Sequence, residues 1–314
     1  MTARKKILFV GGYGRSGSTL LDRVLGHSSP SLFSGGEIRH IFAEGYAENR
    51  LCGCGTPFLQ CPFWTSVSDH AFGGSDALDI SEVLARKQRV DRWWLIPRLA
   101  ARPLHNGRWG RDLAAHQELL SKLYDGIVTE SGCEVIIDST KDPSHGYVLA
   151  TMPDVDLYVI HLVRDSRAVA HSWQRKKFNP GSGLDMNRYS LLKTGAEWDM
   201  INALISGLKP LSAGYTVVHY EDFISDPSHA LTGVFDMIGV DPSLPADGKV
   251  TFADDHTVAG NPIRFTRGET QLKLDDEWRR TMATTGKITM TGLTLPALAS
   301  YGFRLSWRPS AQDV

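Results

Sequence analysis

The stretch KKILFVGGYGRSGSTLLDRVLG, residues 5–26, decides the fold of this chain. Its residues 7–10 form a short apolar run, which predicts a first strand. A glycine-rich turn follows, and apolar residues at 20, 21, 24 and 25 then have helical spacing. Strand, glycine loop and helix in this order predict a phosphate-binding loop, because the helix dipole and the loop's backbone N–H groups favour an anion.

The loop lacks the lysine of the standard nucleotide-binding pattern. Gly12 and Gly17 have the G-x-x-x-x-G spacing and Thr19 holds the Ser/Thr position, but Ser18 stands where the lysine is expected. Arg15 lies inside the loop and can bind a terminal oxyanion instead. The loop therefore favours a shorter anion, such as a 5′-phosphosulfate, over ATP. A glycine turn that binds nothing is the alternative.

The rest of the pattern predicts an α/β fold, with a central, mostly parallel sheet flanked by helices. Apolar runs predict further strands, and amphipathic segments between them predict helices. Residues 45 to about 80 are rich in Gly, Pro and Cys and read as a surface insertion, followed by a basic helical segment from 80 to 104. We expect one domain over residues 1–314, with a cysteine-containing and helical insertion at about 45–130. The segment from 278 to 303 is expected to pack over the sheet. The predicted strands are 7–10, 32–33, 134–138, 157–163 and 216–220, and the predicted helices include 112–131, 144–152, 186–208 and 227–239.

Bulk properties exclude several classes of partner. The 314 residues carry a net charge of −1, so no global field recruits nucleic acid or an acidic membrane. No apolar run approaches the length of a membrane span, and the N-terminal run is too short for a secretion signal. We therefore expect a cytoplasmic protein.

Three of the four cysteines cluster in LCGCGTPFLQCPFW, residues 51–64. Cys52, Cys54 and Cys61 could be packed or free thiols, a Cys52–Cys61 disulfide, or three ligands of a metal whose fourth ligand is His70 or Cys133. A reducing compartment disfavours the disulfide. Packed or free thiols are the favoured interpretation, and we assign no metal ligands.

Polar residues follow several predicted strands, at the sheet edge where open α/β folds bind ligands. Glu37 is either a helix-start carboxylate or a general base. Asp138 could bind Mg²⁺, which would indicate a kinase, or be structural while Lys141 is the working group. Arg164 and Ser172, eight residues apart on a strand end and a helix, form a candidate phosphate-binding pair.

Together these motifs resemble sulfotransferases that use 3′-phosphoadenosine 5′-phosphosulfate (PAPS). The sequence GRSGSTLL, residues 14–21, resembles the family's 5′-phosphosulfate loop, and VRDSRAVAHS, residues 163–172, resembles its 3′-phosphate motif. The likeness is closest to the tyrosylprotein-sulfotransferase-like branch and its bacterial relatives. Four segments carry it: GEIR at 36–39, TKDP at 140–143, VHYED at 218–222 and GNPIR at 260–264.

This resemblance implies a P-loop-type sulfotransferase fold and transfer of a sulfuryl group from PAPS to a hydroxyl by in-line displacement, leaving PAP and requiring no metal. Glu37 would accept the acceptor's proton, while Arg15 and Lys141 would stabilise the transferred group. The small-molecule branch uses a histidine base that has no counterpart two residues after Lys141, and His145 is a possible stand-in. The implied donor contacts are Gly14, Arg15, Ser16, Gly17, Ser18, Thr19, Arg164, Ser172, Tyr220 and Arg264.

The acceptor and the oligomeric state stay open, and homo-oligomerisation is one possibility. The expected acceptor loops are 45–110, 178–195 and 256–270, and their aromatic residues favour a small-molecule, glycan or lipid-like acceptor. The basic segment 86–102 is either a lid over that acceptor or a solvated face. A P-loop kinase and a catalytically silent nucleotide-binding scaffold are the rival functions. The aromatic residues in question are Trp93, Trp94, Trp109 and Phe178.

Overall fold

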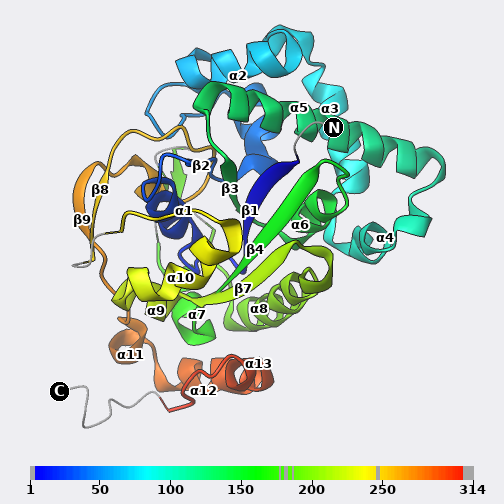
Figure 1. Cartoon of the computed structure of the whole chain (residues 1–314). Coiled ribbons are helices and arrows are strands. Elements are labelled where there is room, and N and C mark those ends of the chain that lie inside the picture. Colours follow the sequence, from blue (N-terminus) through cyan, green and yellow to red (C-terminus); the bar gives the residue numbers. More distant parts are fainter. Residues whose placement is uncertain (1–3, 177, 180–182, 186, 245–247, 307–314) are drawn as a thin grey trace.

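A computed structural model describes residues 4–176, 178–179, 183–185, 187–244 and 248–306 of the chain. Its centre is a five-stranded sheet in which every described pair is parallel and the strand order is β2-β3-β1-β4-β7 (Figure 1). This confirms the α/β fold with a central parallel sheet. The strands are β1 (Lys5–Gly11), β2 (Leu32–Ser34), β3 (Val135–Lys141), β4 (Val155–Val163) and β7 (Gly214–His219).

The apolar run of β1 is buried on both sides of the sheet, as expected for a central parallel strand. Ile7 and Phe9 belong to one core, and Leu8 and Val10 belong to the other, because successive side chains of a strand point to opposite faces. All four are 0% exposed. Because both faces of β1 are buried, its residues are all apolar. They do not alternate between apolar and polar as in a strand with one exposed face.

Helices cover both faces (Figure 1). One core contains side chains of α2 (Pro62–Phe72), α5 (Gly107–Ser131), α6 (Pro143–Ala150) and α8 (Leu191–Ser206). The other contains side chains of α1 (Ser18–Gly26), α9 (Tyr220–Ser225), α10 (Pro227–Ile238) and the strand β8 (Lys249–Phe252), which pairs with β9 (Gly268–Gln271). The remaining elements are α3 (Ile80–Val90), α4 (Ile96–Ala100), α7 (Ser166–Gln174), α11 (Trp278–Thr281), α12 (Thr284–Leu293), α13 (Leu295–Ser300) and the short pair β5 (Phe178–Asn179) and β6 (Leu184–Asp185).

One expectation about the peripheral segments is wrong. Residues 45–80 are not a surface insertion, because Phe58, Cys61, Trp64 and Val67 are at most 2% exposed and belong to the main core. Their apolar residues lack a steady period because the segment consists of short helical pieces, Phe58–Gln60, α2 and Ser75–Ala77, joined by irregular chain.

The segment from 278 to 303, at the bottom of Figure 1, packs on helices α7 and α8 and also contacts the sheet. Leu298 lies in one cluster with Val163 of β4, and the Tyr301 ring lies 5.6 Å from that of His161, also in β4. The expected contact of this segment with the sheet is therefore present, although helices lie beneath much of it. Its residues Trp278, Met282 and Met290 form a small separate cluster with α7.

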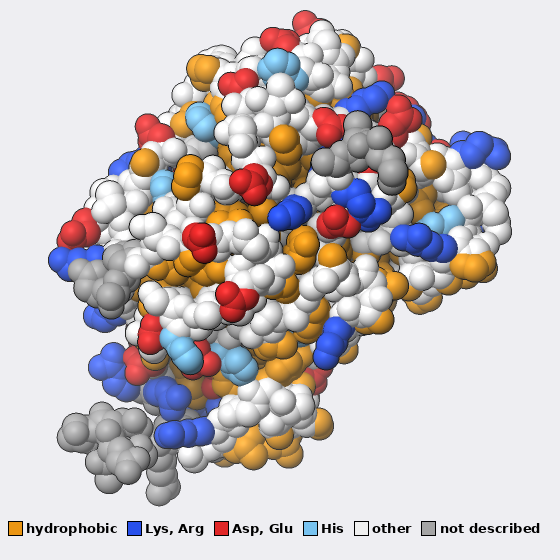
Figure 2. Space-filling model, viewed as in Figure 1, with side chains coloured by type: hydrophobic (Ala, Val, Ile, Leu, Met, Phe, Trp, Pro, Cys, Tyr) orange, Lys and Arg blue, Asp and Glu red, His pale blue; other side chains and the backbone are white. Residues whose placement is uncertain are grey.

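The predicted helix from 80 to 104 is broken. It divides into α3 and α4, and Pro97 lies in the first turn of α4, a position where the missing N–H of proline is tolerated. Lys, Arg, Asp and Glu side chains are interspersed over most of the face seen in Figure 2, in keeping with a net charge of −1. Among the described residues, no helix is long and apolar enough to cross a membrane.

Candidate active site

A cavity of about 740 Å³ lies at the loop between β1 and α1 and at the ends of β3 and β4. It is lined by most of the residues that the sequence nominated. Ser16 and Arg264 do not line it. Ser16 is 1% exposed, and Arg264 is 3% exposed with its guanidinium donating to the carbonyls of Thr257 and Leu51 at 2.7 and 2.6 Å. The nominated residues that do line it are Gly14, Arg15, Gly17, Ser18, Thr19, Glu37, Lys141, Arg164, Ser172 and Tyr220.

The glycines of the loop are required by close packing. At Gly12 (φ 147°) an added Cβ would lie 2.3 Å from the carbonyl oxygen of Leu162, and at Gly17 (φ 90°) it would lie 2.5 Å from the ring of Tyr220. Helix α1 begins at Ser18, and its first backbone bonds are those from residues 20 and 21 to the Gly17 carbonyl. The N–H groups of Ser18 and Thr19 therefore precede the hydrogen-bonded part of the helix, at the cavity wall, where an anion can accept from them.

Arg15 is the cation of the loop. Its Nε and Nη2 atoms are buried and have no hydrogen-bond partner among the described residues. The guanidinium lies 4.8 Å from the ring centroid of Trp173, and burial lowers the pKa of Arg15. A buried cation without a counter-ion is costly, so this side chain is arranged for an anion that enters the cavity.

Glu37 and Lys141 form an ion pair at the cavity wall. Lys141 Nζ donates to Glu37 Oε1 and also to the Ser139 carbonyl at 3.2 Å. Their side chains are only 16% and 18% exposed. The register between β1 and β3 shifts just before Gly11 pairs with Lys141, and Lys141 has a φ of 70°, so a bulge at the end of β3 turns the lysine toward the carboxylate.

Arg164 directly follows β4, and its side chain contacts the phosphate loop. Its Nη1 donates to the Arg15 carbonyl at 3.0 Å and its Nη2 to the Asp275 carbonyl at 2.9 Å, while the guanidinium lies 4.3 Å from the Tyr220 ring centroid. Arg164 Nε is buried without a partner among the described residues. Ser172, half-buried in α7, lines the same cavity, so the predicted pair does share one site.

The structure separates Asp138 and His145 from this cavity. Asp138 is 0% exposed and accepts hydrogen bonds from Thr140, from Tyr124 at 3.1 Å and from His145 Nε2 at 2.9 Å. Burial acts to raise the pKa of Asp138, but His145 and the hydrogen bonds outweigh burial and lower it. Both oxygens are occupied by protein donors, so Asp138 is structural. His145 is committed to Asp138, which removes it as a stand-in base.

Several cavity residues were not nominated from the sequence. His40 Nε2 lies 3.8 Å from Glu37 Oε2, and burial lowers the pKa of His40 to about 4. The loop before Arg264 lines the cavity with Gly260, Asn261 and Ile263, and the Asn261 N–H donates to Thr19 Oγ1 at 3.3 Å. The other such residues include Glu44, Arg50, Trp173, Tyr189, Gly260 and Lys273.

The aromatic residues expected at the acceptor do not line this cavity. Trp93 and Trp94 are 53% and 57% exposed elsewhere, and the Trp109 indole donates to the Arg89 carbonyl at 3.0 Å. In their place, Trp173 and Tyr189 stack with ring centroids 4.4 Å apart at the cavity wall. Tyr189 lies in the expected acceptor loop 178–195, and Trp173 directly follows Ser172 in α7, but neither was singled out from the sequence.

The basic segment 86–102 is not a lid over the cavity, because none of its residues line it. Its first half is paired with acidic side chains of α3 itself, of the residue that caps α3, and of α5. Arg89 binds Asp112 at 2.8 Å and Glu82 at 3.0 Å, and Lys87 lies 3.6 Å from Asp91. The solvated-face interpretation therefore applies.

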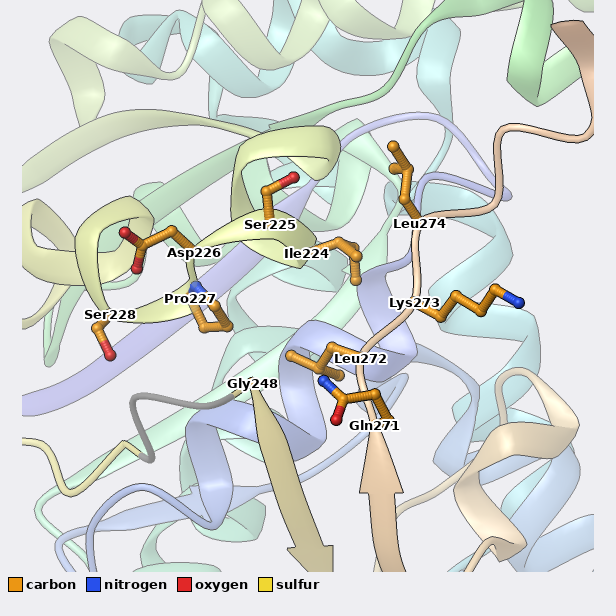
Figure 3. A pocket seen from close by; sticks show the side chains of 10 residues that line it. All are labelled: Ile224, Ser225, Asp226, Pro227, Ser228, Gly248, Gln271, Leu272, Lys273 and Leu274. Atoms are coloured by element: carbon orange, nitrogen blue, oxygen red, sulfur yellow. The ribbon is translucent and has the colours of Figure 1, made fainter. Parts of the chain in front are cut away.

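A second cavity, of about 620 Å³, lies between the junction of α9 and α10 and the β8–β9 hairpin (Figure 3). Gln271, Leu272 and Lys273 line both cavities, so this stretch forms the wall between them. Lys273 extends away from the other side chains in Figure 3. The second cavity contains none of the nominated residues.

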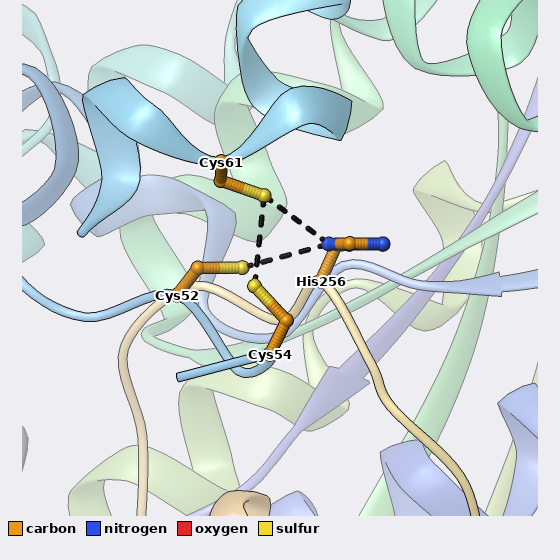
Figure 4. A group of neighbouring side chains, drawn as sticks. All are labelled: Cys52, Cys54, Cys61 and His256. Carbon is orange, nitrogen blue, oxygen red and sulfur yellow. Dashed lines mark hydrogen bonds between the residues drawn. The ribbon is translucent and has the colours of Figure 1, made fainter. Parts of the chain in front are cut away.

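The four cysteines are free, so the disulfide alternative is wrong. Cys52, Cys54 and Cys61 meet, and the residue that joins them is His256 (Figure 4). His70 instead lies 3.7 Å from Glu130, and Cys133 is a buried residue of the main core. His256 could not be predicted as their neighbour, because it lies 204 residues after Cys52 and 195 after Cys61 in the chain.

Comparisons with known proteins place the chain in a family. A model of the "Sulfotransferase family" matches residues 8–243, three quarters of the chain. The sulfotransferase domain from the curacin biosynthetic pathway matches in structure with a TM-score of 0.55 and 16% identity, covering 97% of this chain and 100% of that one. The sulfotransferase domain from the Synechococcus PCC 7002 olefin synthase gives a TM-score of 0.48 and 20% identity, with 98% of each chain covered.

A search of the curated proteins found no significant match. The structural likeness shows the fold, whereas the family model spans the phosphate loop, Lys141, Arg164 and Tyr220 together. On that match, the chain belongs to the sulfotransferase family.

Proposed function

We propose that this protein, as one domain over residues 1–314, transfers a sulfuryl group from PAPS to a hydroxyl of a small, polar acceptor in the cytoplasm. The observation that carries the proposal is the pairing of an unsatisfied Arg15 guanidinium with a Glu37–Lys141 ion pair in one cavity. The Arg15 guanidinium requires an anion as its partner, and the Glu37–Lys141 pair supplies a carboxylate beside a cation. Sulfuryl transfer needs a bound anionic donor, a base and a stabilising cation.

Glu37 is the proposed general base. The Lys141 ammonium binds one oxygen of its carboxylate, and the Glu37 backbone N–H donates to the Val258 carbonyl at 2.7 Å. The side chain and the backbone of Glu37 are thus each held by a different segment. An acceptor hydroxyl beside it would lose its proton to the carboxylate as the oxygen attacks sulfur. His40, with its pKa lowered by burial, stays neutral near pH 7 and adds no competing cation.

Arg15 and Lys141 are the proposed electrostatic stabilisers. Negative charge develops on the oxygen that bridges sulfur and the 5′-phosphate as the bond breaks, and preorganised cations near that oxygen lower the barrier. The N–H groups of Ser18 and Thr19, with the Thr19 hydroxyl, would hold the 5′-phosphate. These contacts bind and orient the donor, and none of them requires a metal ion.

Arg164, Ser172 and Tyr220 are the proposed readers of the 3′-phosphate. Arg164 Nε is unpaired, and Ser172 offers a hydroxyl in the same cavity. A guanidinium with a neighbouring hydroxyl is a phosphate-binding pair. We withdraw Arg264 from the donor contacts, because its donors are used on backbone carbonyls.

The acceptor is proposed to be polyhydroxylated. The segment after Glu37 brings His40, Glu44 and Arg50 to the cavity wall, and Arg50 is paired with Glu44 at 2.9 Å. Sugars and other hydroxylated metabolites find hydrogen-bond partners in such a lining, whereas a purely apolar acceptor leaves these groups unsatisfied.

The experiment is a transfer assay with sulfur-labelled PAPS over a panel of sugars, glycolipids and phenols, with products identified by mass. Label is expected in an acceptor hydroxyl without added Mg²⁺. Transfer of a phosphoryl group from ATP in the presence of Mg²⁺, with none from PAPS, would establish the kinase alternative and end the proposal.

A further inference from the structure

Three thiols and one imidazole converge at the edge of the main core (Figure 4). The Sγ atoms of Cys52, Cys54 and Cys61 and a ring nitrogen of His256 all lie within 4.8 Å of one another. Cys52 and Cys61 are 1% and 0% exposed, and Cys54 and His256 are half-buried. Neither the fold nor the proposed sulfuryl transfer requires these four side chains to meet.

Their spacing is that of a tetrahedral metal shell. With Zn–S near 2.3 Å and Zn–N near 2.1 Å, a regular tetrahedron places two sulfurs about 3.8 Å apart and a sulfur and a nitrogen about 3.6 Å apart. The Cys54–Cys61 Sγ distance is 3.7 Å, and His256 Nδ1 lies 3.2 Å from Cys61 Sγ and 3.8 Å from Cys52 Sγ. A disulfide requires about 2.05 Å instead.

The backbone on the cysteine side is shaped for this convergence. Residues 51–57 form a tight hairpin in which the Cys52 N–H donates to the Thr56 carbonyl at 2.8 Å and Gly55 has a φ of 89°. At Gly53 an added Cβ would lie 2.4 Å from Thr257 Oγ1, so the glycine lets the hairpin reach the segment that carries His256. Cys61 directly precedes α2, where the helix dipole favours a thiolate.

The histidine is fixed in an equally specific way. Its carbonyl accepts a hydrogen bond from Trp64 Nε1 at 2.8 Å, and its ring stacks on Phe63 with centroids 4.8 Å apart and planes 8° apart. Both aromatic residues follow Cys61 in α2. The same helix start therefore holds one sulfur ligand and the imidazole ligand, which keeps their spacing constant.

A buried arginine lies near the cluster. Three thiolates around a divalent cation leave a net charge of −1, which a buried site must balance. The Arg264 guanidinium donates to the carbonyls of Leu51 and Thr257. These two residues are the chain neighbours of the ligands Cys52 and His256. Arg267 Nη2 donates to the Gly53 carbonyl at 2.5 Å, but this arginine is exposed and paired with Asp254. The buried Arg264 is therefore the cation that balances a metal thiolate centre, and its burial is more favourable beside thiolates than beside neutral thiols.

We propose that Cys52, Cys54, Cys61 and His256 bind one Zn²⁺ ion in a structural site with four protein ligands. Three thiolates and an imidazole in tetrahedral array select zinc among the common divalent metals. Binding releases the protons of the three thiols and changes no oxidation state. All four ligands lie within one shell, so the site is sized for a single ion and not for a two-iron cluster.

The site connects two segments that meet at the catalytic cavity. Two residues after His256, Val258 pairs with Gly36, and its carbonyl accepts from the Glu37 N–H. Gly260 then lies so close to Thr19 and Glu37 that an added Cβ would be 3.3 Å from an oxygen of each. The ion therefore anchors the loop that covers the donor. This consequence rests on the proposed function, whereas the metal site itself does not.

The test is the metal content of tag-free protein purified without added metal, measured by plasma mass spectrometry. One zinc per chain is expected, falling at least tenfold in Cys61→Ser and in His256→Ala. Cys133→Ser is the matched control, because it removes a buried cysteine outside the cluster, and it should keep one zinc. Zinc-free wild-type protein that remains folded, or iron in place of zinc, would overturn the proposal.

A second measurement avoids dependence on variants that fail to fold. X-ray absorption at the zinc edge of the wild-type protein is expected to give about three sulfur neighbours near 2.3 Å and one nitrogen near 2.0–2.1 Å. Oxygen or nitrogen neighbours alone would show that zinc binds elsewhere and contradict the site. Because neither measurement involves a sulfuryl donor, failure here and failure of the proposed transferase activity are separate results.

Discussion

Lys141 donates a hydrogen bond to the Glu37 carboxylate across the edge of the sheet, although 104 residues separate them in the chain. Lys141 ends β3, and Glu37 follows the neighbouring strand β2, so adjacent parallel strands bring them together. The Lys141 cation stabilises the Glu37 carboxylate in the cavity that also contains Arg15. It places a base and a cation where proton removal and charge stabilisation are needed together.

Glu37→Gln is expected to lower kcat by about 10²- to 10⁴-fold, because the amide cannot accept the acceptor's proton. The amide oxygen can still accept from Lys141, so the affinity for PAP should stay within about threefold of wild type. Initial rates with PAPS and calorimetric titration with PAP measure the two effects. A variant with undiminished kcat would exclude Glu37 as the base.

Arg164→Ala is expected to weaken PAP binding by about 10- to 150-fold, the loss of a charged hydrogen bond worth about 1.5–3 kcal/mol. Binding of AMP, which lacks the 3′-phosphate, should hardly change. Arg175→Ala is the control, because this side chain lies on the surface just beyond α7, is 50% exposed and pairs with Glu277 at 2.8 Å. Equal losses for PAP and AMP would mean that Arg164 does not read the 3′-phosphate.

Arg15→Met is expected to stabilise the ligand-free protein while abolishing donor binding. Methionine keeps the contact with Trp173 and removes a cation whose Nε and Nη2 are unsatisfied. The gain should be about 1 kcal/mol in urea unfolding, with PAP affinity reduced at least tenfold. A variant that unfolds more easily than wild type would show that Arg15 already has a stabilising partner.

His116 should make stability fall in acid. It is 1% exposed in α5, neither ring nitrogen has a partner among the described residues, and burial lowers its pKa to about 3. Between pH 6.5 and 3, His116 is protonated in the unfolded chain but stays neutral in the folded one. Its contribution to the free energy of unfolding is therefore complete above pH 6.5 and falls as the pH is lowered below that value.

At pH 4.5 this loss amounts to about 2–3 kcal/mol relative to pH 7. Urea unfolding of wild type and His116→Leu at both pH values measures it, because leucine removes the titration and other acid-sensitive groups cancel in the comparison. The variant should lose less stability than wild type by about this amount. Parallel losses in the two proteins would refute the assignment.

The sequence predicted the parts of the site that depend on local order. The phosphate loop, the strand-end positions of Lys141 and Arg164, and the helical position of Ser172 follow from short motifs and from the rule that parallel strands end at one edge. These residues do line one cavity. Their roles stay predictions until activity is measured.

The sequence could not supply features that depend on how distant loops return. Arg264 sits in a motif that resembles a nucleotide contact, yet its side chain binds the carbonyls of Leu51 and Thr257. His256 joins the three cysteines only because the 253–265 segment runs beside the 51–57 hairpin. Such tertiary contacts have no periodicity and no fixed spacing in the sequence, so no local sequence pattern predicts them.

The central claim is that the cavity binds an adenosine 3′,5′-bisphosphate donor and not a triphosphate. Calorimetric titration of the purified protein with PAP and with ATP plus Mg²⁺ tests it directly. The account predicts that PAP binds at least 100-fold more tightly, because Arg164 and Ser172 read the 3′-phosphate and no loop lysine holds a γ-phosphate. Tighter binding of ATP with Mg²⁺ than of PAP would contradict it.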